Sequence, residues 1–163
     1  MCIRDSDFTG NLLQQKDAGP AANVIQTFVL DDLTNVAYVN RSEGDQYSVL
    51  AGQWIDDHLA VVHSSGLIEY GLGDALNSIV ATVDQTGTVQ GHVFYDPFGQ
   101  TTTKNSTYPF EYSGRMLITG GLYYYRARFY NPTSGRFISE DPMGFTGDFN
   151  LYPYCLLYTS RCV

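Results

Sequence analysis

The sequence predicts an all-β protein built as an antiparallel meander. Tyrosine occupies 13 of the 163 positions, and aromatic and β-branched side chains favour strands. Charged residues make up only 16% of the chain. Short apolar runs recur at intervals of roughly 8–12 residues and are separated by Gly, Asp, Asn and Ser, which is the pattern of successive hairpins. These three observations together indicate one antiparallel sheet or a strip of a larger one.

A series of short strands is expected over the first hundred residues. The ranges are 27–32, 35–40, 47–54, 59–63, 67–70, 78–84 and 88–95. We expect residues 1–22 to be irregular, because Asp17-Ala-Gly-Pro20 is a cluster of strand breakers. Residues 71–77 are expected to form a loop. The predicted organisation is therefore an irregular start (1–22), a meander (23–100), a polar linker (101–109), a second β region (110–154) and a terminal tail (155–163).

The stretch 121–130, Gly-Leu-Tyr-Tyr-Tyr-Arg-Ala-Arg-Phe-Tyr, is the most distinctive part of the chain. We expect a single strand over 122–130, because aromatic residues favour a half-buried pleated surface. Alternation would then place Tyr124, Arg126, Arg128 and Tyr130 on one face. A turn at 131–135, a returning strand at 136–139 and a second turn at 141–144 follow. Such a hairpin would bring Asp141 near the strand that carries Arg128.

This stretch resembles the core-domain signature of bacterial RHS (rearrangement hot spot), or YD-repeat, proteins. The matching segments are 121–130, 135–142 (Gly-Arg-Phe-Ile-Ser-Glu-Asp-Pro) and 150–154 (Asn-Leu-Tyr-Pro-Tyr), preceded by 95–99 (Tyr-Asp-Pro-Phe-Gly) and 110–115. The resemblance covers about 23–154. A weak internal repeat joins the Tyr70 and Tyr95 strand ends, 25 residues apart. The resemblance implies a strip of the RHS β-shell that ends in the core-domain plug.

In this family the shell is expected to enclose a C-terminal toxin that an aspartic protease activity cuts free. The resemblance transfers the catalytic roles to Asp141, in Asp141-Pro142-Met143-Gly144, and to Arg128. The chemistry needs two carboxylates that share one proton, because like charges roughly 3 Å apart cannot both ionise. The resemblance implies a second Asp-Pro-x-Gly motif about 18 residues after the first, and residues 145–163 contain none. We therefore expect this polypeptide to be unable to cut itself.

Simpler interpretations stay open for the same residues. Asp141 can be an ordinary turn residue that bonds a backbone N–H. Arg128 can be a strand arginine stacked on Tyr124 or Tyr130. The rival function is a cell-surface adhesion or wall protein, in which exposed tyrosines and Trp54 bind carbohydrate or other proteins. A third interpretation is a fragment with no activity of its own.

Composition argues against several classes of function. The formal charge of −8 disfavours nucleic acid, and no apolar run reaches the roughly 20 residues of a membrane span. His58, His63 and His92 lack further ligands at metal spacing, and no cofactor-binding motif occurs. Cys2, Cys155 and Cys162 lie in end segments that resemble translated sequencing adapters. The partners implied by the resemblance are the toxin cargo and secretion-system or toxin-complex components, for a secreted or surface-located bacterial protein.

Overall fold

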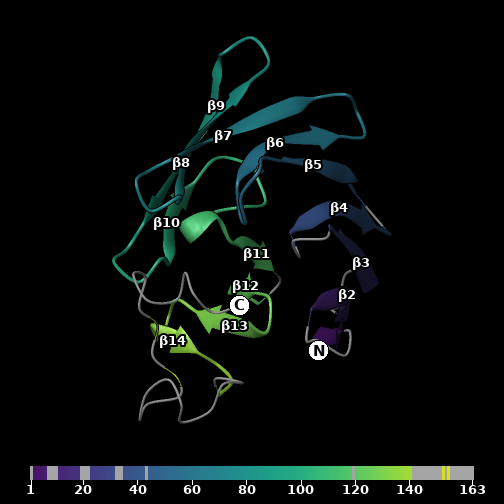
Figure 1. The fold of residues 1–163 in the computed structure, drawn as a ribbon, viewed down its shortest axis with the longest axis vertical. Helices are drawn as coiled ribbons and strands as arrows, with labels where there is room; N and C mark the ends of the chain where they lie inside the picture. The colour runs from purple at the N-terminus through teal and green to yellow at the C-terminus, as the bar shows by residue number, and fades with distance from the viewer. Residues whose placement is uncertain are drawn as a thin grey trace.

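The computed structural model shows an arched sheet that wraps around a smaller one (Figure 1). It describes residues 2–6, 11–18, 23–31, 35–42, 44–118, 120–140, 152 and 154. The large sheet has ten strands in the order β1 to β10, and the small sheet has four in the order β11 to β14. Each strand pairs antiparallel with its neighbours along the chain. The prediction of an all-β antiparallel meander is confirmed.

The large sheet consists of β1 (Cys2–Ser6), β2 (Leu12–Ala18), β3 (Asn23–Leu30), β4 (Val36–Arg41), β5 (Tyr47–Ala51), β6 (His58–His63), β7 (Ile68–Gly73), β8 (Ile79–Asp84), β9 (Val89–Tyr95) and β10 (Thr101–Lys104). A single 3₁₀ turn, η1 (Tyr112–Gly114), leads into the small sheet. This sheet consists of β11 (Met116–Ile118), β12 (Leu122–Tyr125), β13 (Arg128–Asn131) and β14 (Arg136–Phe137). Within the described ranges, no helix is long and apolar enough to cross a membrane.

Two polar segments were expected to be irregular and are strands instead. In the first segment, 1–22, residues 2–6 form β1 and residues 12–18 form β2, which pairs with β1 on one side and β3 on the other. Leu12 and Gln15 of β2 are buried although the segment is largely polar. Residues 101–104, expected as linker, form β10 on the edge of β9. Pairing with an existing strand satisfies the backbone of both segments, so tertiary context overrides their weak apolar pattern.

One five-residue turn recurs between strands of the large sheet, at 74–78, 84–88 and 96–100. In each copy the Oδ1 of the first residue accepts the backbone N–H groups of the third and fifth residues, at 2.8–3.0 Å. The fourth residue has a positive φ: 62° at Asn77, 82° at Gly87 and 84° at Gly99. Asn and Gly tolerate this conformation best. The unit that repeats in the structure is therefore a turn that begins with Asp. Residues 71–77 were expected to form a loop, but Gly71 lies within β7.

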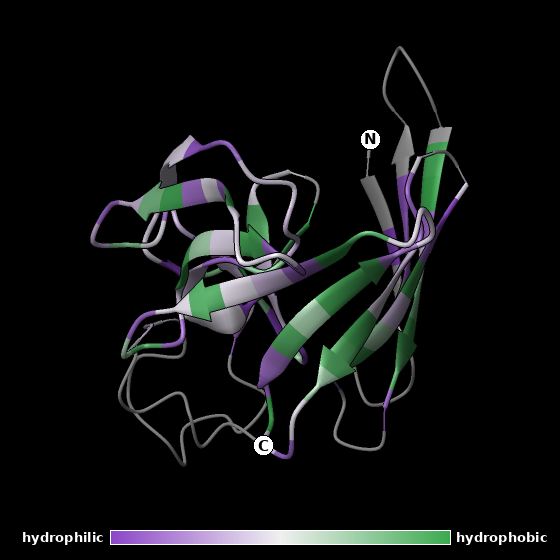
Figure 2. Ribbon diagram, turned by 90° about the horizontal axis from the view of Figure 1, so that it is seen from above, coloured by the Kyte–Doolittle hydropathy of each residue, from purple (hydrophilic) through white to green (hydrophobic). Residues whose placement is uncertain are grey.

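The main core lies between the inner face of the large sheet and one face of the small sheet (Figures 1 and 2). Side chains from both sheets meet there, and each large apolar side chain that is buried contributes roughly 1.5–3 kcal/mol. The buried members are Leu12, Phe28, Val36, Val39, Tyr47, Val49, Val61, Ile79, Tyr108, Phe110, Met116, Ile118 and Tyr124. The large sheet also exposes apolar side chains, including Leu50, Leu72 and Phe94. Trp54, in the loop between β5 and β6, is 75% exposed.

The segment 122–130 is a hairpin of two strands, so the prediction of a single strand was wrong. Tyr123 pairs with Tyr130 and Tyr125 with Arg128, which leaves Arg126 and Ala127 as a two-residue turn. Arg126 adopts a φ of 56°. The chain reversal moves Arg128 onto the same face as Tyr123, Tyr125 and Tyr130. A Gly or Asn usually marks such a turn, and none occurs here.

This face of the small sheet carries a second cluster, which we call the tyrosine cluster. Its buried centre is Tyr123, Tyr130 and Phe137, surrounded by Tyr112, Leu117, Tyr125 and Tyr154. The rings meet at stacked, tilted or edge-on angles with centroids 4.2–6.4 Å apart. Offset-stacked and edge-on arrangements suit the quadrupoles of aromatic rings. The small sheet is thus covered on both faces, by the main core and by the tyrosine cluster.

Candidate functional site

Arg128, the first residue of β13, lies beside the tyrosine cluster and is buried, with 5% of its surface exposed. Its guanidinium carbon lies 3.8 Å from the centre of the Phe137 ring. A cation over an aromatic face is attracted by the ring quadrupole, and more strongly where water is excluded. The aromatic partner is therefore Phe137 of β14. Tyr124, which we considered from the sequence, packs in the main core on the other face.

Asp141 lies outside the residues that the structure describes, so its distance from Arg128 stays a prediction. The chain leading to it is fixed as far as Ile138, whose N–H donates to the Phe129 carbonyl at 3.0 Å. Asp141 comes four positions after Phe137, and an extended chain spans at most about 3.5 Å per residue. The two Cα atoms are therefore no more than about 14 Å apart. This limit is compatible with the predicted pairing of Asp141 and Arg128.

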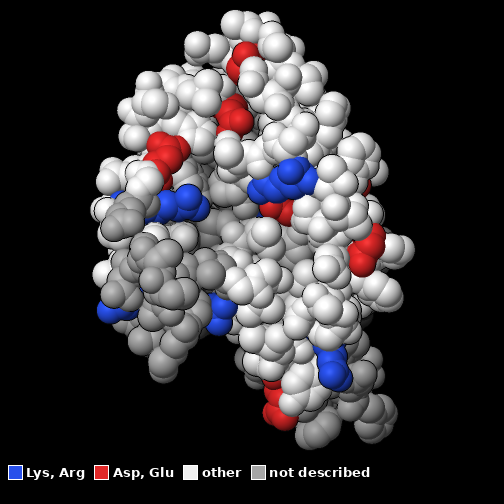
Figure 3. Space-filling model, turned by 180° about the vertical axis from the view of Figure 1, so that it is seen from behind, with Lys and Arg blue, Asp and Glu red and all other residues white. Residues whose placement is uncertain are grey.

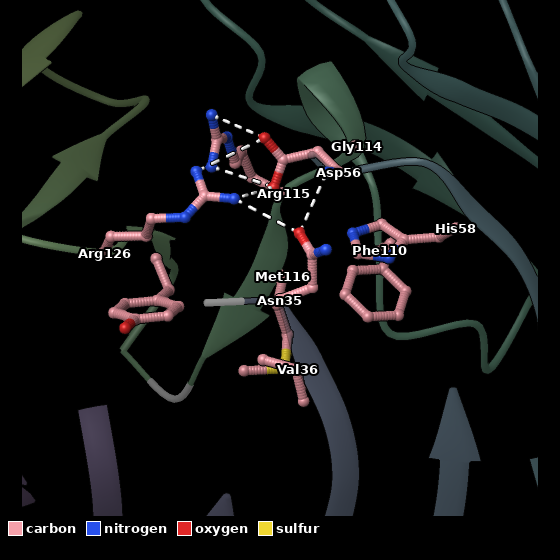
Figure 4. A pocket seen from close by; sticks show the side chains of 10 residues that line it. Asn35, Val36, Asp56, His58, Phe110, Gly114, Arg115, Met116 and Arg126 are labelled. Carbon is pink, nitrogen blue, oxygen red and sulfur yellow. Dashed lines mark hydrogen bonds and ion pairs between the residues drawn. The ribbon is translucent and has the colours of Figure 1, made fainter. Parts of the chain in front are cut away.

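A second site, which the sequence did not reveal, brings two arginines to one carboxylate (Figure 4). Arg115 Nη2 lies 2.9 Å from Asp56 Oδ2, and Arg126 Nη2 lies 2.9 Å from Asp56 Oδ1. Asn35 Oδ1 accepts the Asp56 N–H at 2.9 Å and Arg126 Nη2 at 3.3 Å. We call this group of four residues the arginine clasp. It joins the large sheet to the start of β11 and to the β12–β13 turn.

The backbone around the arginine clasp is strained. Among the described residues, four non-glycine residues have positive φ, and Asp56 (63°) and Arg126 (56°) belong to the clasp itself. Asn77 (62°) donates its side-chain N–H to the Asp56 carbonyl at 2.9 Å. Ser113 (53°) lies two residues before Arg115. Such conformations cost on the order of 1–3 kcal/mol each and persist only where the surroundings fix them.

The clasp borders a small cavity of about 20 Å³, which has room for one water molecule. His58 lines this cavity and stacks on Phe110, with ring centroids 3.7 Å apart and planes 18° apart. Burial lowers the pKa of His58 to about 4, and the guanidiniums of Arg115 and Arg126 add to this against the attraction of Asp56. The imidazole is therefore neutral at pH 7.

The chemistry of the clasp is structural. A protease dyad needs a second carboxylate close enough to share a proton, whereas guanidiniums and an amide face Asp56. Within the described part of the chain, no group of three His, Cys, Asp or Glu side chains could hold a metal ion. No local sequence pattern marks the clasp, because Arg115 and Arg126 lie 59 and 70 residues from Asp56.

A different environment surrounds His63 at the other end of β6. Its Nδ1 contacts the Asp45 carboxylate, and its Nε2 lies 3.1 Å from Glu69 Oε2. Ser64 Oγ donates to Asp45 at 3.0 Å. Burial alone would raise the pKa of Asp45, but the hydrogen bonds from His63 and Ser64 outweigh it and lower that pKa. This histidine clamp links the β4–β5 loop, β6 and β7.

Charged side chains of both signs are scattered over the face shown in Figure 3. The low charged fraction of the sequence, 16%, agrees with this sparse distribution. The ion pairs described above are therefore local features of two loops and a hairpin. They do not extend into a charged binding surface on this face.

The arched meander with its small second sheet defines the class of the protein: the chain has the all-β fold of the RHS β-shell. It matches the structure titled "Crystal Structure of TcdB2-TccC3-Cdc42" with a TM-score of 0.73 and 20% identity, over 97% of this chain and 8% of that chain. No known family model matches the sequence.

The sequence is similar to parts of two curated proteins. The chain is 33% identical over 92 residues to the toxin subunit YenC1 of Yersinia entomophaga, which covers 52% of this chain and 9% of the relative. It is 32% identical over 83 residues to the putative uncharacterized protein YlbH of Escherichia coli (strain K12), covering 48% of this chain and 35% of the relative. The chain thus spans about a third of YlbH and less than a tenth of YenC1. The chain is thus similar in sequence to part of a toxin subunit and has the fold of the RHS β-shell.

Proposed function

We propose that the chain is part of an RHS shell that encloses a C-terminal toxin and releases it by self-cleavage. The similarity to a toxin subunit, YenC1, carries this proposal. The arched sheet supports it, because a strip that curves around a core can form part of a closed container. The partners are then the enclosed toxin and the components of a toxin complex or secretion system, in a secreted bacterial protein.

In the cleavage step, Asp141 is one of two carboxylates that activate water, and Arg128 holds negative charge beside them. The buried position of Arg128 over Phe137, four residues before Asp141, supports this role. A guanidinium in a dry site interacts strongly with developing negative charge. The motif that would supply the second carboxylate does not follow Asp141 in this sequence, so we expect the isolated chain not to cut itself.

The test uses a longer protein that carries this segment together with its downstream region. Replacing Asp141 with Asn should abolish the cleaved band on a denaturing gel. Asp84→Asn, in an exposed hairpin turn, is the matched control and should leave cleavage intact. Undiminished cleavage in the Asp141 variant would remove this residue from the mechanism.

Encapsulation needs a separate measurement, because a shell can hold cargo without cutting it. The downstream region should resist added protease while the shell is folded, and should become sensitive when urea opens the shell. Equal digestion in both conditions would argue against enclosure. This outcome is independent of the cleavage result.

An adhesion protein is the second candidate, and the exposure of Trp54 is the observation that favours it. A solvent-facing indole on a loop suits carbohydrate or protein binding. The tyrosines give it less support, since Tyr47, Tyr108, Tyr123, Tyr124 and Tyr130 are all buried. Glycan binding that is lost in Trp54→Ala would favour this candidate.

A further inference from the structure

The first residue of β6, His58, sits at the junction of the two sheets. Its ring is stacked between the clasp and Phe110, the residue that forms an isolated bridge with Met116 of β11. The Nδ1 atom of His58 is buried and has no hydrogen-bond partner among the residues that the structure describes. A neutral imidazole tolerates this position, whereas a cationic ring would need acceptors for both of its N–H groups.

The charges facing His58 come from three directions. Asp56 lies two residues before it, Arg115 approaches from the start of β11, and Arg126 approaches from the β12–β13 turn. Asp31 belongs to the next layer of contacts, since its carboxylate accepts the side-chain N–H of Asn35, a member of the clasp, at 3.1 Å. Two cations and one anion therefore surround the ring directly.

Tyr124 completes the surroundings of the ring from β12. Its hydroxyl accepts the Leu12 N–H at 2.9 Å and is already used within the core. A proton placed on His58 would therefore add a third positive charge beside Asp56. Asp56 and a hydrogen bond to the backbone of Gly114 favour the charged ring, but burial and the two guanidiniums outweigh them.

We propose that protonation of His58 opens the junction between the two sheets. Uptake of a proton by its ring places a cation beside the two guanidiniums of the clasp. The ring then leaves Phe110 for solvent, and the β5–β6 loop moves away from β11. The release needs no disruption of the β6 ladder beyond its first pair, because Ala51 and His58 form the last pair of β5 with β6.

The expected size of the effect follows from proton linkage. The His58 pKa is about 4 in the closed junction and 6.5 for an ordinary histidine in the open one. The open state therefore binds more protons between these values, and acid favours it. From pH 7 to pH 5 the equilibrium constant for opening should rise about 20-fold. Carboxylates contribute little in this range, because they titrate near pH 4.

Hydrogen exchange of the intact chain at pH 7 and pH 5 tests the proposal. Protection factors, which correct for the intrinsic exchange rate, should fall about 20-fold for the amides around Phe110, Arg115 and Met116. The β8–β9 hairpin should keep its protection. His58→Phe, which preserves stacking but takes up no proton, should remove the pH dependence, and His92→Phe, at an exposed site, should not.

Two results would overturn the proposal. One is an equal fall in protection at the junction and at the β8–β9 hairpin, which would indicate global unfolding. The other is the same pH dependence in the wild type and in His58→Phe. An NMR titration of the ring protons gives a direct check: His58 should titrate well below the ordinary histidine value of 6.5, and a titration at that value would contradict a closed, uncharged ring.

Discussion

The two ends of β6 place the same amino acid in opposite electrostatic surroundings. At the start of the strand, His58 has two guanidiniums beside it and an unpaired buried nitrogen. At the end, His63 lies between the carboxylates of Asp45 and Glu69. A cationic ring can donate to both of these carboxylates, whereas the first site disfavours the same cation. Neighbouring charges, and not the residue type, therefore decide which of the two sites suits a cationic ring.

Removing the carboxylate that the two arginines share should give the largest change in the free energy of unfolding. Asp56→Asn leaves two largely buried guanidiniums beside each other without a counter-charge. We expect the free energy of unfolding to fall by about 2–4 kcal/mol, allowing for partial exposure of the site. Urea unfolding at pH 7 measures it. Asp84→Asn is the control, and an equal effect in both variants would show that the clasp contributes nothing special.

Acidification should disrupt the two ends of β6 in a fixed order. The His58 pKa is lowered to about 4, so the unfolded chain takes up this proton first and stability falls between pH 6.5 and 4, by up to about 3 kcal/mol. The pKa of Asp45 is also lowered, so its contribution persists until the pH drops below 4. Exchange measurements at each end of β6 should show the His58 end weakening first. The reverse order would contradict the assignment of charges.

Neutralising one side of the histidine clamp should have a moderate effect. Glu69 is buried and accepts His63 Nε2 and Thr107 Oγ1. In Glu69→Gln the charge-assisted hydrogen bond becomes a neutral one, which should lower the free energy of unfolding by about 1–2 kcal/mol. Urea unfolding at pH 6 measures this. A loss that was unchanged in a His63→Phe background would show that the two residues are not coupled.

The smallest change is expected at a hairpin remote from both histidines. In Asp84→Ala the N–H groups of Thr86 and Thr88 lose their acceptor but stay open to water. We expect the free energy of unfolding to fall less than in any of the other variants. The loss should be the same at pH 5 and pH 7. A loss that varied across this range would make the hairpin unsuitable as the reference for His58.

The meander could be predicted from the sequence because its signals are local. Apolar alternation marks most strands of the large sheet, and Asp, Asn and Gly mark its turns. The small sheet was harder, because its central turn uses Arg126, whose positive φ is held by ion pairs with Asp56. Nothing within the hairpin itself signals that turn. Strand β2 was missed for a similar reason, since its pairing partners supply what its polar sequence lacks.

The candidate site also has a part that the sequence could predict and parts that it could not. The family resemblance indicated Arg128, and the structure adds that it is buried against Phe137. The clasp and the histidine clamp could not be predicted, because their members come from separate loops. Side chains 59–70 residues apart meet only after the sheet has curved.

The high exposure of Trp54 affects how this molecule can be observed by spectroscopy. It is the single tryptophan in the sequence, and its ring already faces water in the folded state. Indole emission will therefore change little when the fold is lost, and a flat fluorescence trace would be no sign of stability. The buried phenol rings are the better optical reporters, through their near-ultraviolet dichroism.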